Sequence, residues 1–535
     1  MNLRMFGILL VIFTAIIAVA QSDSAVNPPP VRTDSGLVAG VFEAGGKVVA
    51  FEGIPYAAPP IGEFRWKPPQ AAPKWDGVRS AKGFGPHCPQ FESSPDVVFR
   101  DSGSSEDCLT LNVWASASAR NDRLPVMVWV HGGGFAYGGS SEPRQDGRYL
   151  AARHVIVVSM NYRLGILGFF VHPELTAESS HHASGNYGLM DMTAALGWVK
   201  RNIASFGGDP DNITLFGDSA GSFAVSALMA SPISRGMLSK AIGESGGAFF
   251  SPGLVVESRE MREERDTSLA KAAFGTSRLP ELRKLSATEI VRDVVGKLGP
   301  LVFGPDVDGY FLPDSVPNIY AAGEQAHIPL LAGWTVDEGR NQVVLANPKI
   351  TATSFVAQAQ REFGANSEKF LALYPARTSE ELQNSAAEYA GDHSIAYSTW
   401  KWLEAQAKTD NVPAFRYFFE LGSPGDKNHS VSLGAFHTDD IEYVFGTLDS
   451  RSGATWRPED RELSERMMSY WTNFARTGDP NGPALPQWPA YTERSGWEVM
   501  HLDVVQEAIR DTHRDRYLFL DQAWDKQPNS SQSKP

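Results

Sequence analysis

Apolar and polar positions alternate along the chain with two different periods. Apolar runs at residues 124–130, 154–161, 328–334 and 413–421 have the length and composition of buried strands. After the second run, apolar residues recur at intervals of three and four, which predicts an amphipathic helix that ends at Gly207-Gly208. The helix positions are Leu189, Met192, Leu196, Val199 and Ile203. Strands that alternate with helices predict an α/β fold with a large, mostly parallel sheet covered on both faces.

The remaining patterns add elements around this sheet. Residues 36–51 contain two short apolar runs separated by a glycine-rich turn, which predicts a hairpin. Residues 250–325 and 345–410 are helical in pattern, and we expect these two insertions to cover a site on the sheet. A last edge strand is expected at residues 517–520.

The N-terminal residues have the pattern of an export signal. Arg4 precedes a nearly unbroken apolar run at residues 5–19, and Ala18-Val19-Ala20 offers a cleavage pattern of small residues. We therefore expect residues 1–20 to be a signal peptide and the protein to be periplasmic or secreted. Position 21 is glutamine rather than cysteine, which argues against a lipid anchor, and no later apolar run is long enough to span a membrane.

Composition narrows the possible partners. The chain has 535 residues, 42% of them hydrophobic and 21% charged, as in ordinary globular proteins. We predict a linker at residues 21–30, one domain over residues 31–525 and a disordered tail at residues 526–535. The net charge of −14 argues against nucleic acid as a partner, because no basic surplus exists to neutralise phosphates. Nothing in the sequence sets the oligomeric state.

Two cysteines, Cys88 and Cys108, are present. In an exported protein an even pair predicts one disulfide, and closing a loop of this size would stabilise the fold by about 3 kcal/mol.

Two other patterns suggest a metal site only weakly. Asp306-Val307-Asp308-Gly309 lacks the further ligands of a calcium loop, and His181-His182 has no third ligand nearby. We expect no metal and no cofactor.

Residues 213–224 contain the strongest candidate for chemistry. They predict a short strand, a sharp turn at Ser219 and the start of a helix, with Gly217 and Gly221 placed symmetrically around the serine. Glycines at those two positions let neighbouring backbone approach closely, so the turn can present the hydroxyl above the sheet. The pattern Gly-x-Ser-x-Gly is common by chance, so its surroundings decide whether Ser219 is a nucleophile.

A serine nucleophile needs a base, an acid that orients the base, and donors for an oxyanion. The run Gly132-Gly133-Gly134 directly follows the strand at residues 124–130, so Gly133, Gly134 and Ala220 could supply three backbone N–H donors. In chain order the acid and then the histidine follow the serine. The pattern leaves alternatives for both. The acid is Glu338 or Asp337, and the histidine is His437, His393, His429 or His327.

Beyond these local patterns, the sequence resembles the type-B carboxylesterase/lipase family, which includes cholinesterases and bacterial para-nitrobenzyl esterases. The resemblance covers nearly the whole chain after the signal peptide. Its motifs are Phe51-Glu-Gly-Ile-Pro-Tyr56, Glu106-Asp-Cys-Leu109, His131-Gly-Gly-Gly-Phe135, Asn161-Tyr-Arg-Leu-Gly165, Gly185-Asn-Tyr-Gly-Leu-Met-Asp191, Phe206-Gly-Gly-Asp-Pro210, Phe216-Gly-Asp-Ser-Ala-Gly221 and Trp471-Thr-Asn-Phe-Ala475. The resemblance implies an α/β-hydrolase fold and hydrolysis of a small-molecule ester through an acyl-enzyme.

The resemblance also implies roles for individual residues. Ser219 would be the nucleophile, Glu338 the acid and His437 the base, with Gly133, Gly134 and Ala220 as oxyanion donors. Ser245 would support the acid. Further implied pairs are the disulfide Cys88–Cys108 and the structural salt bridges Arg65–Glu106 and Arg163–Asp191.

Two departures from the family pattern bear on the substrate. Met192 replaces a common glutamine, and the short loop from Cys88 to Cys108 contains no tryptophan that could hold a choline cation. Acetylcholine is therefore disfavoured, and the ester itself stays open. The alternatives are hydrolysis of an amide, lactone or thioester by the same residues, or a non-catalytic adhesion protein of the same family.

Overall fold

The computed structural model describes residues 27–91, 97–118, 122–249, 256–344, 349–409, 412–424 and 434–524. The predicted signal peptide and the predicted C-terminal tail lie outside the described residues.

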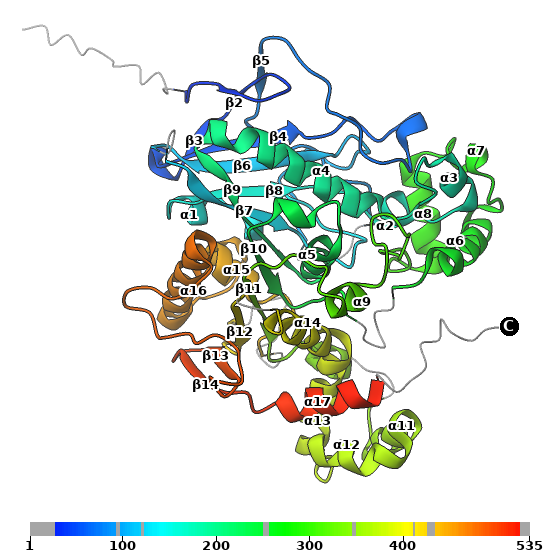
Figure 1. The fold of residues 1–535 in the computed structure, drawn as a ribbon, viewed down its shortest axis with the longest axis vertical. Coiled ribbons are helices and arrows are strands. Elements are labelled where there is room, and N and C mark those ends of the chain that lie inside the picture. The colour runs from blue at the N-terminus through cyan, green and yellow to red at the C-terminus, as the bar shows by residue number, and fades with distance from the viewer. Residues whose placement is uncertain are drawn as a thin grey trace, which may run out of the picture.

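An eleven-stranded sheet crosses the described part of the chain (Figure 1). Its strand order is β14-β13-β12-β11-β10-β9-β7-β8-β6-β4-β3. The seven strands from β13 to β8 are mutually parallel. The strands at the two edges of the sheet, β14 on one side and β6, β4 and β3 on the other, are joined by antiparallel pairing. The strands are β3 (Val41–Glu43), β4 (Val48–Pro55), β6 (Thr110–Ser116), β7 (Leu124–Val130), β8 (Ile156–Met160), β9 (Gly208–Asp218), β10 (Lys240–Glu244), β11 (Leu330–Thr335), β12 (Ala414–Phe419), β13 (Glu498–Leu502) and β14 (Glu507–Arg510).

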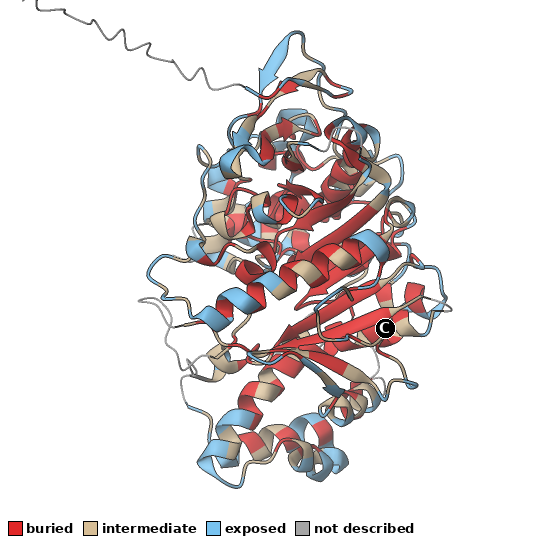
Figure 2. Cartoon of the chain, turned by 90° about the vertical axis from the view of Figure 1, so that its left-hand side faces the viewer, coloured by how far each residue is buried: buried red, intermediate tan, exposed pale blue. Residues whose placement is uncertain are grey.

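Alternate residues of the central strands pack into two separate cores, one on each face of the sheet. On β7, Val126, Val128 and Val130 face the core formed with α4 (Tyr187–Asn202), α5 (Ala220–Ala230) and α14 (Tyr397–Ala407). Met127 and Trp129 face the opposite core, formed with α1 (Arg148–Ala151), α15 (Ile441–Phe445) and α16 (Pro458–Thr477). Buried residues therefore fill the strands, while the outer faces of the helices are exposed (Figure 2). This is the predicted α/β-hydrolase architecture.

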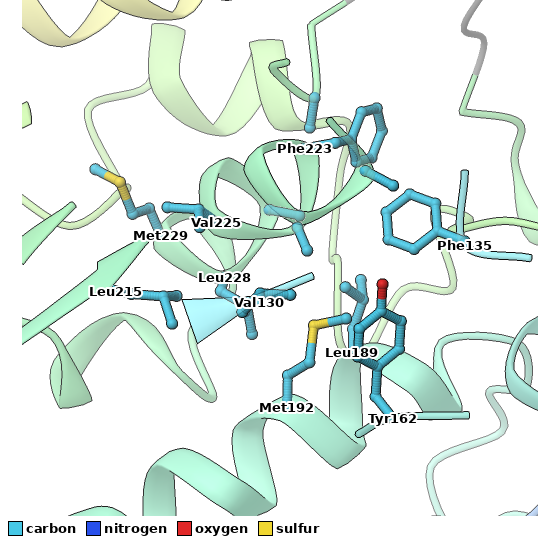
Figure 3. Close-up of a cluster of buried hydrophobic side chains, with 14 of the residues drawn as sticks. Val130, Phe135, Tyr162, Leu189, Met192, Leu215, Phe223, Val225, Leu228 and Met229 are labelled. Carbon is cyan, nitrogen blue, oxygen red and sulfur yellow. The ribbon is translucent and has the colours of Figure 1, made fainter. Parts of the chain in front are cut away.

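Helix α5 lies directly behind the turn that carries Ser219. Figure 3 shows its side chains Phe223 and Leu228 among apolar residues of the sheet and of α4. Helix α4 continues into a short 3-10 turn and stops at Gly207, whose φ of 91° only glycine adopts without strain. The helix that the apolar spacing predicted is thus present, with its C-terminal cap where the glycine pair stands.

The two regions with helical patterns are helical in the structure. The first contains α6 (Arg259–Phe274), α7 (Leu279–Leu282), α8 (Ala287–Leu298) and α9 (Val316–Ala321). The second contains α11 (Ala352–Phe363), α12 (Ser367–Leu373), α13 (Ser379–Gly391) and α14, with a π-helical turn at Asp392–Ala396 between the last two. The other described helices are α2 (Gly165–Phe169), α3 (Pro173–Glu178), α10 (Arg340–Val344) and α17 (Arg514–Trp524).

Two predicted strands are corrected by the structure. Residues 517–520 are not an edge strand but part of α17, because Tyr517, Leu520 and Trp524 repeat at intervals of three and four and are buried together. The first arm of the predicted hairpin is divided at Gly40. Its C-terminal half, β3, pairs with β4, whereas β2 (Leu37–Ala39) joins β1 (Val31–Arg32) and β5 (Val78–Ser80) in a separate small sheet.

Covalent and ionic links hold the loops around this sheet. Cys88 and Cys108 form a disulfide with a Cα–Cα distance of 5.0 Å. Arg65 pairs with Glu106 at 2.6 Å, and buried Arg163 pairs with buried Asp191 at 2.7 Å. In the described ranges, no helix combines the length and the apolar character needed to cross a bilayer.

Candidate active site

Ser219 stands between β9 and α5 in a strained backbone conformation, with φ 56° and ψ −123°. Neighbouring backbone leaves no room for side chains at the flanking glycines. A Cβ atom at Gly217 would lie 2.6 Å from the carbonyl oxygen of Val130, and one at Gly221 would lie 2.1 Å from the same atom. The end of β7 therefore presses against the turn, and the Ser219 N–H donates to the Glu244 carbonyl oxygen at 2.8 Å. These contacts hold the strained turn in place.

Three side chains that are distant in sequence meet at the carboxyl edge of the sheet. His437 Nε2 lies 2.9 Å from Ser219 Oγ, and His437 Nδ1 lies 2.6 Å from Glu338 Oε2. Glu338 follows β11, and His437 follows β12, which is the next strand in the sheet. Both distances are within hydrogen-bond range, so a proton can pass from the hydroxyl to the imidazole without rearrangement.

The competing acid and histidines lie elsewhere. Asp337 pairs with Arg340. His327 Nε2 contacts the carbonyl oxygen of Gly323, and His393 packs edge-on against Trp524. His429 lies outside the described residues.

The carboxylate of Glu338 is held by several donors. Burial raises the pKa of Glu338, but the charge of protonated His437, the hydrogen bond to its ring, the Ser245 hydroxyl and the Thr335 N–H lower it, and the net pKa lies below the ordinary value. The Thr335 N–H donates to Oε1 at 3.1 Å. The buried Ser245 hydroxyl makes no hydrogen bond of standard geometry within the described part of the chain. It nevertheless lies near enough to the carboxylate to favour its charged form.

The pKa of the His437 imidazole is shifted upward, opposite to the shift of Glu338. Burial by itself lowers the pKa of His437, but the charge and hydrogen bond of Glu338 raise it to about 9, with further contributions from Asp218 and Asp440. The site therefore makes His437 a stronger base than a free histidine. Because only the neutral ring accepts a proton, the same shift raises the pH at which this ring can act as a base.

The glycine run after β7 lies directly beside the serine. A Cβ atom at Gly132 would lie 3.1 Å from Ser219 Cβ, and Gly133 and Gly134 have φ values of 99° and 60°. Within the described ranges, the N–H groups of Gly133, Gly134 and Ala220 donate to no protein acceptor. A run of unused donors next to a hydroxyl is an arrangement that can stabilise an oxyanion.

A group of buried carboxyls that the sequence analysis did not single out lies beneath Ser219. Asp218, Glu244 and Asp440 are fully buried, and each has one oxygen with no partner among the described residues. Burial raises the pKa of all three, that of Asp440 to about 7. The only sequence signal was position: Asp218 precedes the serine, Glu244 precedes Ser245, and Asp440 follows the histidine by three residues.

The two weak metal patterns are loops in the structure. Asp308 Oδ1 accepts the N–H groups of Tyr310 and Leu312, as in an ordinary turn, and the His181 ring stacks on Tyr310. Across the residues that the structure describes, no group of three or more histidine, cysteine or acidic side chains could hold a metal ion.

Comparisons with known proteins identify the family of this chain. The family model described as "Carboxylesterase family" matches residues 27–519. The chain is 36% identical to a fumonisin B1 esterase of Sphingopyxis macrogoltabida, over 91% of this chain and 88% of that protein. It is 35% identical to a para-nitrobenzyl esterase of Bacillus subtilis (88% and 94% covered) and 35% identical to a mouse cholinesterase (86% and 81% covered). The chain therefore belongs to the carboxylesterase family, and it is a carboxylic ester hydrolase.

Proposed function

We propose that the protein is an exported serine esterase in which Ser219, His437 and Glu338 form the catalytic triad. The observation that carries this proposal is the continuous series of close contacts from Ser219 Oγ through the imidazole to Glu338. With Nδ1 bonded to a carboxylate, the neutral ring carries its proton on Nδ1 and leaves Nε2 free to act as the base.

The first half-reaction forms an acyl-enzyme. Ser219 Oγ attacks the ester carbonyl carbon while His437 Nε2 takes its proton, and the carbonyl electron pair moves onto oxygen. The N–H groups of Gly133, Gly134 and Ala220 stabilise that oxyanion. When the tetrahedral intermediate collapses, the bond to the alcohol oxygen breaks and the imidazolium gives its proton to the leaving group.

The second half-reaction releases the acid. Water takes the place of the alcohol, His437 accepts one of its protons, and the resulting nucleophile attacks the acyl carbon. Collapse of the second tetrahedral intermediate breaks the bond to Ser219 Oγ, which recovers its proton from His437. Glu338 stabilises the imidazolium in both halves and stays ionised throughout, in keeping with its lowered pKa.

Relatives with names as different as fumonisin B1 esterase and para-nitrobenzyl esterase are 36% and 35% identical to this chain, so family membership does not identify the ester. Small 4-nitrophenyl esters are suitable first substrates. The same residues could open amide, lactone or thioester bonds, and no observation favours those reactions over ester hydrolysis. Export is inferred from the apolar N-terminal pattern together with the disulfide.

The test is the Ser219→Ala variant with 4-nitrophenyl acetate. We expect kcat to fall by at least about 10⁴-fold, because the nucleophile is lost. Circular dichroism and thermal unfolding should be close to those of the wild type. Ser118→Ala changes an exposed serine far from this turn in sequence and serves as the matched control. Wild-type turnover by folded Ser219→Ala would refute the assignment.

A further inference from the structure

One cation in the site has no role in the mechanism above. Arg144 lies in the short turn η3 (Pro143–Gln145), and its backbone is fixed by a hydrogen bond from the Thr447 hydroxyl to its carbonyl oxygen at 2.6 Å. Its Nε donates to Glu142 Oε2 at 2.9 Å, and Nη1 makes a weak contact of 3.4 Å with Thr438 Oγ1. Its side chain therefore stands next to the residue that follows His437.

Electrostatic effects place the same guanidinium near the other half of the site. The Arg144 charge lowers the pKa of Asp218, the residue before Ser219, against the larger effect of burial. It also opposes the larger rise that burial causes in the pKa of Tyr137, which lies against Gly133. Arg144 thus contacts the residue after His437, and its charge acts on the residue before Ser219.

The outer edge of this guanidinium is available to a ligand. Its side chain is 23% exposed, whereas its partner Glu142 is 2% exposed. Nη2 donates to no acceptor within the described residues, and Nη1 has only the long contact to the Thr438 hydroxyl. An arginine whose Nε edge is fixed and whose Nη groups are open is prepared for bidentate binding of a carboxylate.

The nearby acids leave those Nη groups unoccupied. Glu142 uses only the Nε edge of Arg144. Glu442 is bound by Arg451 through Nε at 3.3 Å and Nη2 at 3.0 Å. Burial raises the pKa of Asp218 well above its ordinary value, and its carboxyl accepts no hydrogen bond from Arg144. The charges of Glu142, Glu442 and Asp218 all act on Arg144, but only Glu142 forms a hydrogen bond with it, so its Nη groups can still donate to a further anion.

The position of Arg144 indicates which part of a substrate it would meet. The alcohol oxygen of the ester must approach His437, because that ring protonates the leaving group. A group attached to this alcohol extends along the loop that continues from His437 to Thr438, which is where the Nη1 contact lies. An anionic leaving group would thus be held while the acyl carbon faces Ser219.

Resting on the proposed function, we propose that Arg144 binds a free carboxylate on the alcohol part of the substrate, so that the natural substrates are O-acyl esters of hydroxy acids. Arg144 is then a residue that determines specificity. It selects the leaving group and takes no part in proton transfer.

A matched pair of esters tests this proposal. 4-Acetoxybenzoic acid and its methyl ester have the same acyl group and differ by one carboxylate on the leaving phenol. In Arg144→Gln, we expect the ratio of kcat/KM for the acid to that for the methyl ester to fall about 10- to 100-fold, the value of a charge-assisted hydrogen bond. Arg123→Gln, which removes an exposed arginine paired with Asp209, should leave the ratio unchanged.

Inhibition by the product phenol gives a second measurement, in which the probe molecule binds but is not hydrolysed. We expect 4-hydroxybenzoate to inhibit 4-nitrophenyl acetate hydrolysis competitively, and to inhibit Arg144→Gln about 10-fold more weakly than the wild type. Arg144→Lys keeps the positive charge but loses the planar guanidinium that binds a carboxylate through two N–H groups. Its ratio of kcat/KM for 4-acetoxybenzoic acid to that for the methyl ester should lie between those of the wild type and Arg144→Gln. If Arg144→Gln does not fold, the wild type decides: 4-hydroxybenzoate must inhibit at least about 10-fold more tightly than its methyl ester.

An unchanged substrate ratio in folded Arg144→Gln, or equal wild-type inhibition by the two phenols, would overturn the proposal and leave Arg144 as a structural partner of Glu142. Failure of the proposed function looks different, because Ser219→Ala would then hydrolyse 4-nitrophenyl acetate like the wild type.

Discussion

Replacing Glu338 by glutamine removes one charge from the site and changes almost no volume. In the wild type, Oε2 lies 2.6 Å from His437 Nδ1 and Oε1 accepts the Thr335 N–H at 3.1 Å. A glutamine must place its NH₂ group against one of these two partners. Against Thr335 it meets another donor. Against His437 it forces Nδ1 to accept, which moves the ring proton to Nε2 and removes the base.

The expected loss in kcat is about 10³- to 10⁴-fold, the size seen when the acid of a serine-protease triad is replaced by its amide. The pH profile should change as well. Glu338 raises the pKa of His437, and an adjacent opposite charge is worth about 1–3 pKa units. Because His437 must be neutral to act, wild-type activity falls as the pH drops through this raised pKa. In Glu338→Gln the acid limb should move to lower pH by about 1–3 units.

The assay is kcat/KM for 4-nitrophenyl acetate across the pH range, corrected for spontaneous hydrolysis. Asp337→Asn is the matched control, because it removes the neighbouring acid, which bonds Arg340 rather than the imidazole. An acid limb at the same pH in Glu338→Gln and in the wild type would refute the pairing. So would wild-type kcat in the variant.

Three further predictions concern the scaffold. Gly221→Ala would place a methyl group 2.1 Å from the Val130 carbonyl oxygen, so we expect loss of soluble protein or a Tm below that of the wild type, measured by expression and thermal unfolding. Arg163→Met leaves its carboxylate partner buried without a cation and should lower the free energy of unfolding by about 3–5 kcal/mol in urea titrations; an unchanged midpoint would contradict this. Replacing both Cys88 and Cys108 by serine should cost about 3 kcal/mol in the same titration, and reducing agent should then have no further effect.

Strong local patterns made part of this fold predictable. The strand at 124–130 and the turn and helix around Ser219 appear as expected, because apolar runs and glycines at tight contacts leave few alternatives, although the strand before Ser219 begins at Gly208 rather than at Ile213. The strands β10 and β13 were not predicted. Each is five residues long and of mixed composition, and such a segment forms a strand because it pairs and packs with neighbouring strands, not because of its own sequence. The apolar run at 517–520 fits either element, and only Trp524 one turn later favours the helix.

The candidate site divides in the same way. The serine and the glycine run could be located from local sequence, because both depend on backbone geometry. The choice of Glu338 over Asp337 rested on family resemblance, since two adjacent acids after a strand have the same pattern. The buried carboxyls of Glu244 and Asp440 could not be found, because burial depends on which helices cover the sheet. Arg144 has no motif, and its open Nη groups depend on contacts that form only in three dimensions.

The order of strands in the sheet has a consequence for how activity arises during folding. The proposed oxyanion loop, serine nucleophile, acid and base follow β7, β9, β11 and β12, so five neighbouring strands of the sheet must be assembled before they meet. Pairings this distant in sequence form slowly. An incompletely folded chain therefore has no assembled site, and hydrolysis by these residues can begin only once the central sheet is complete.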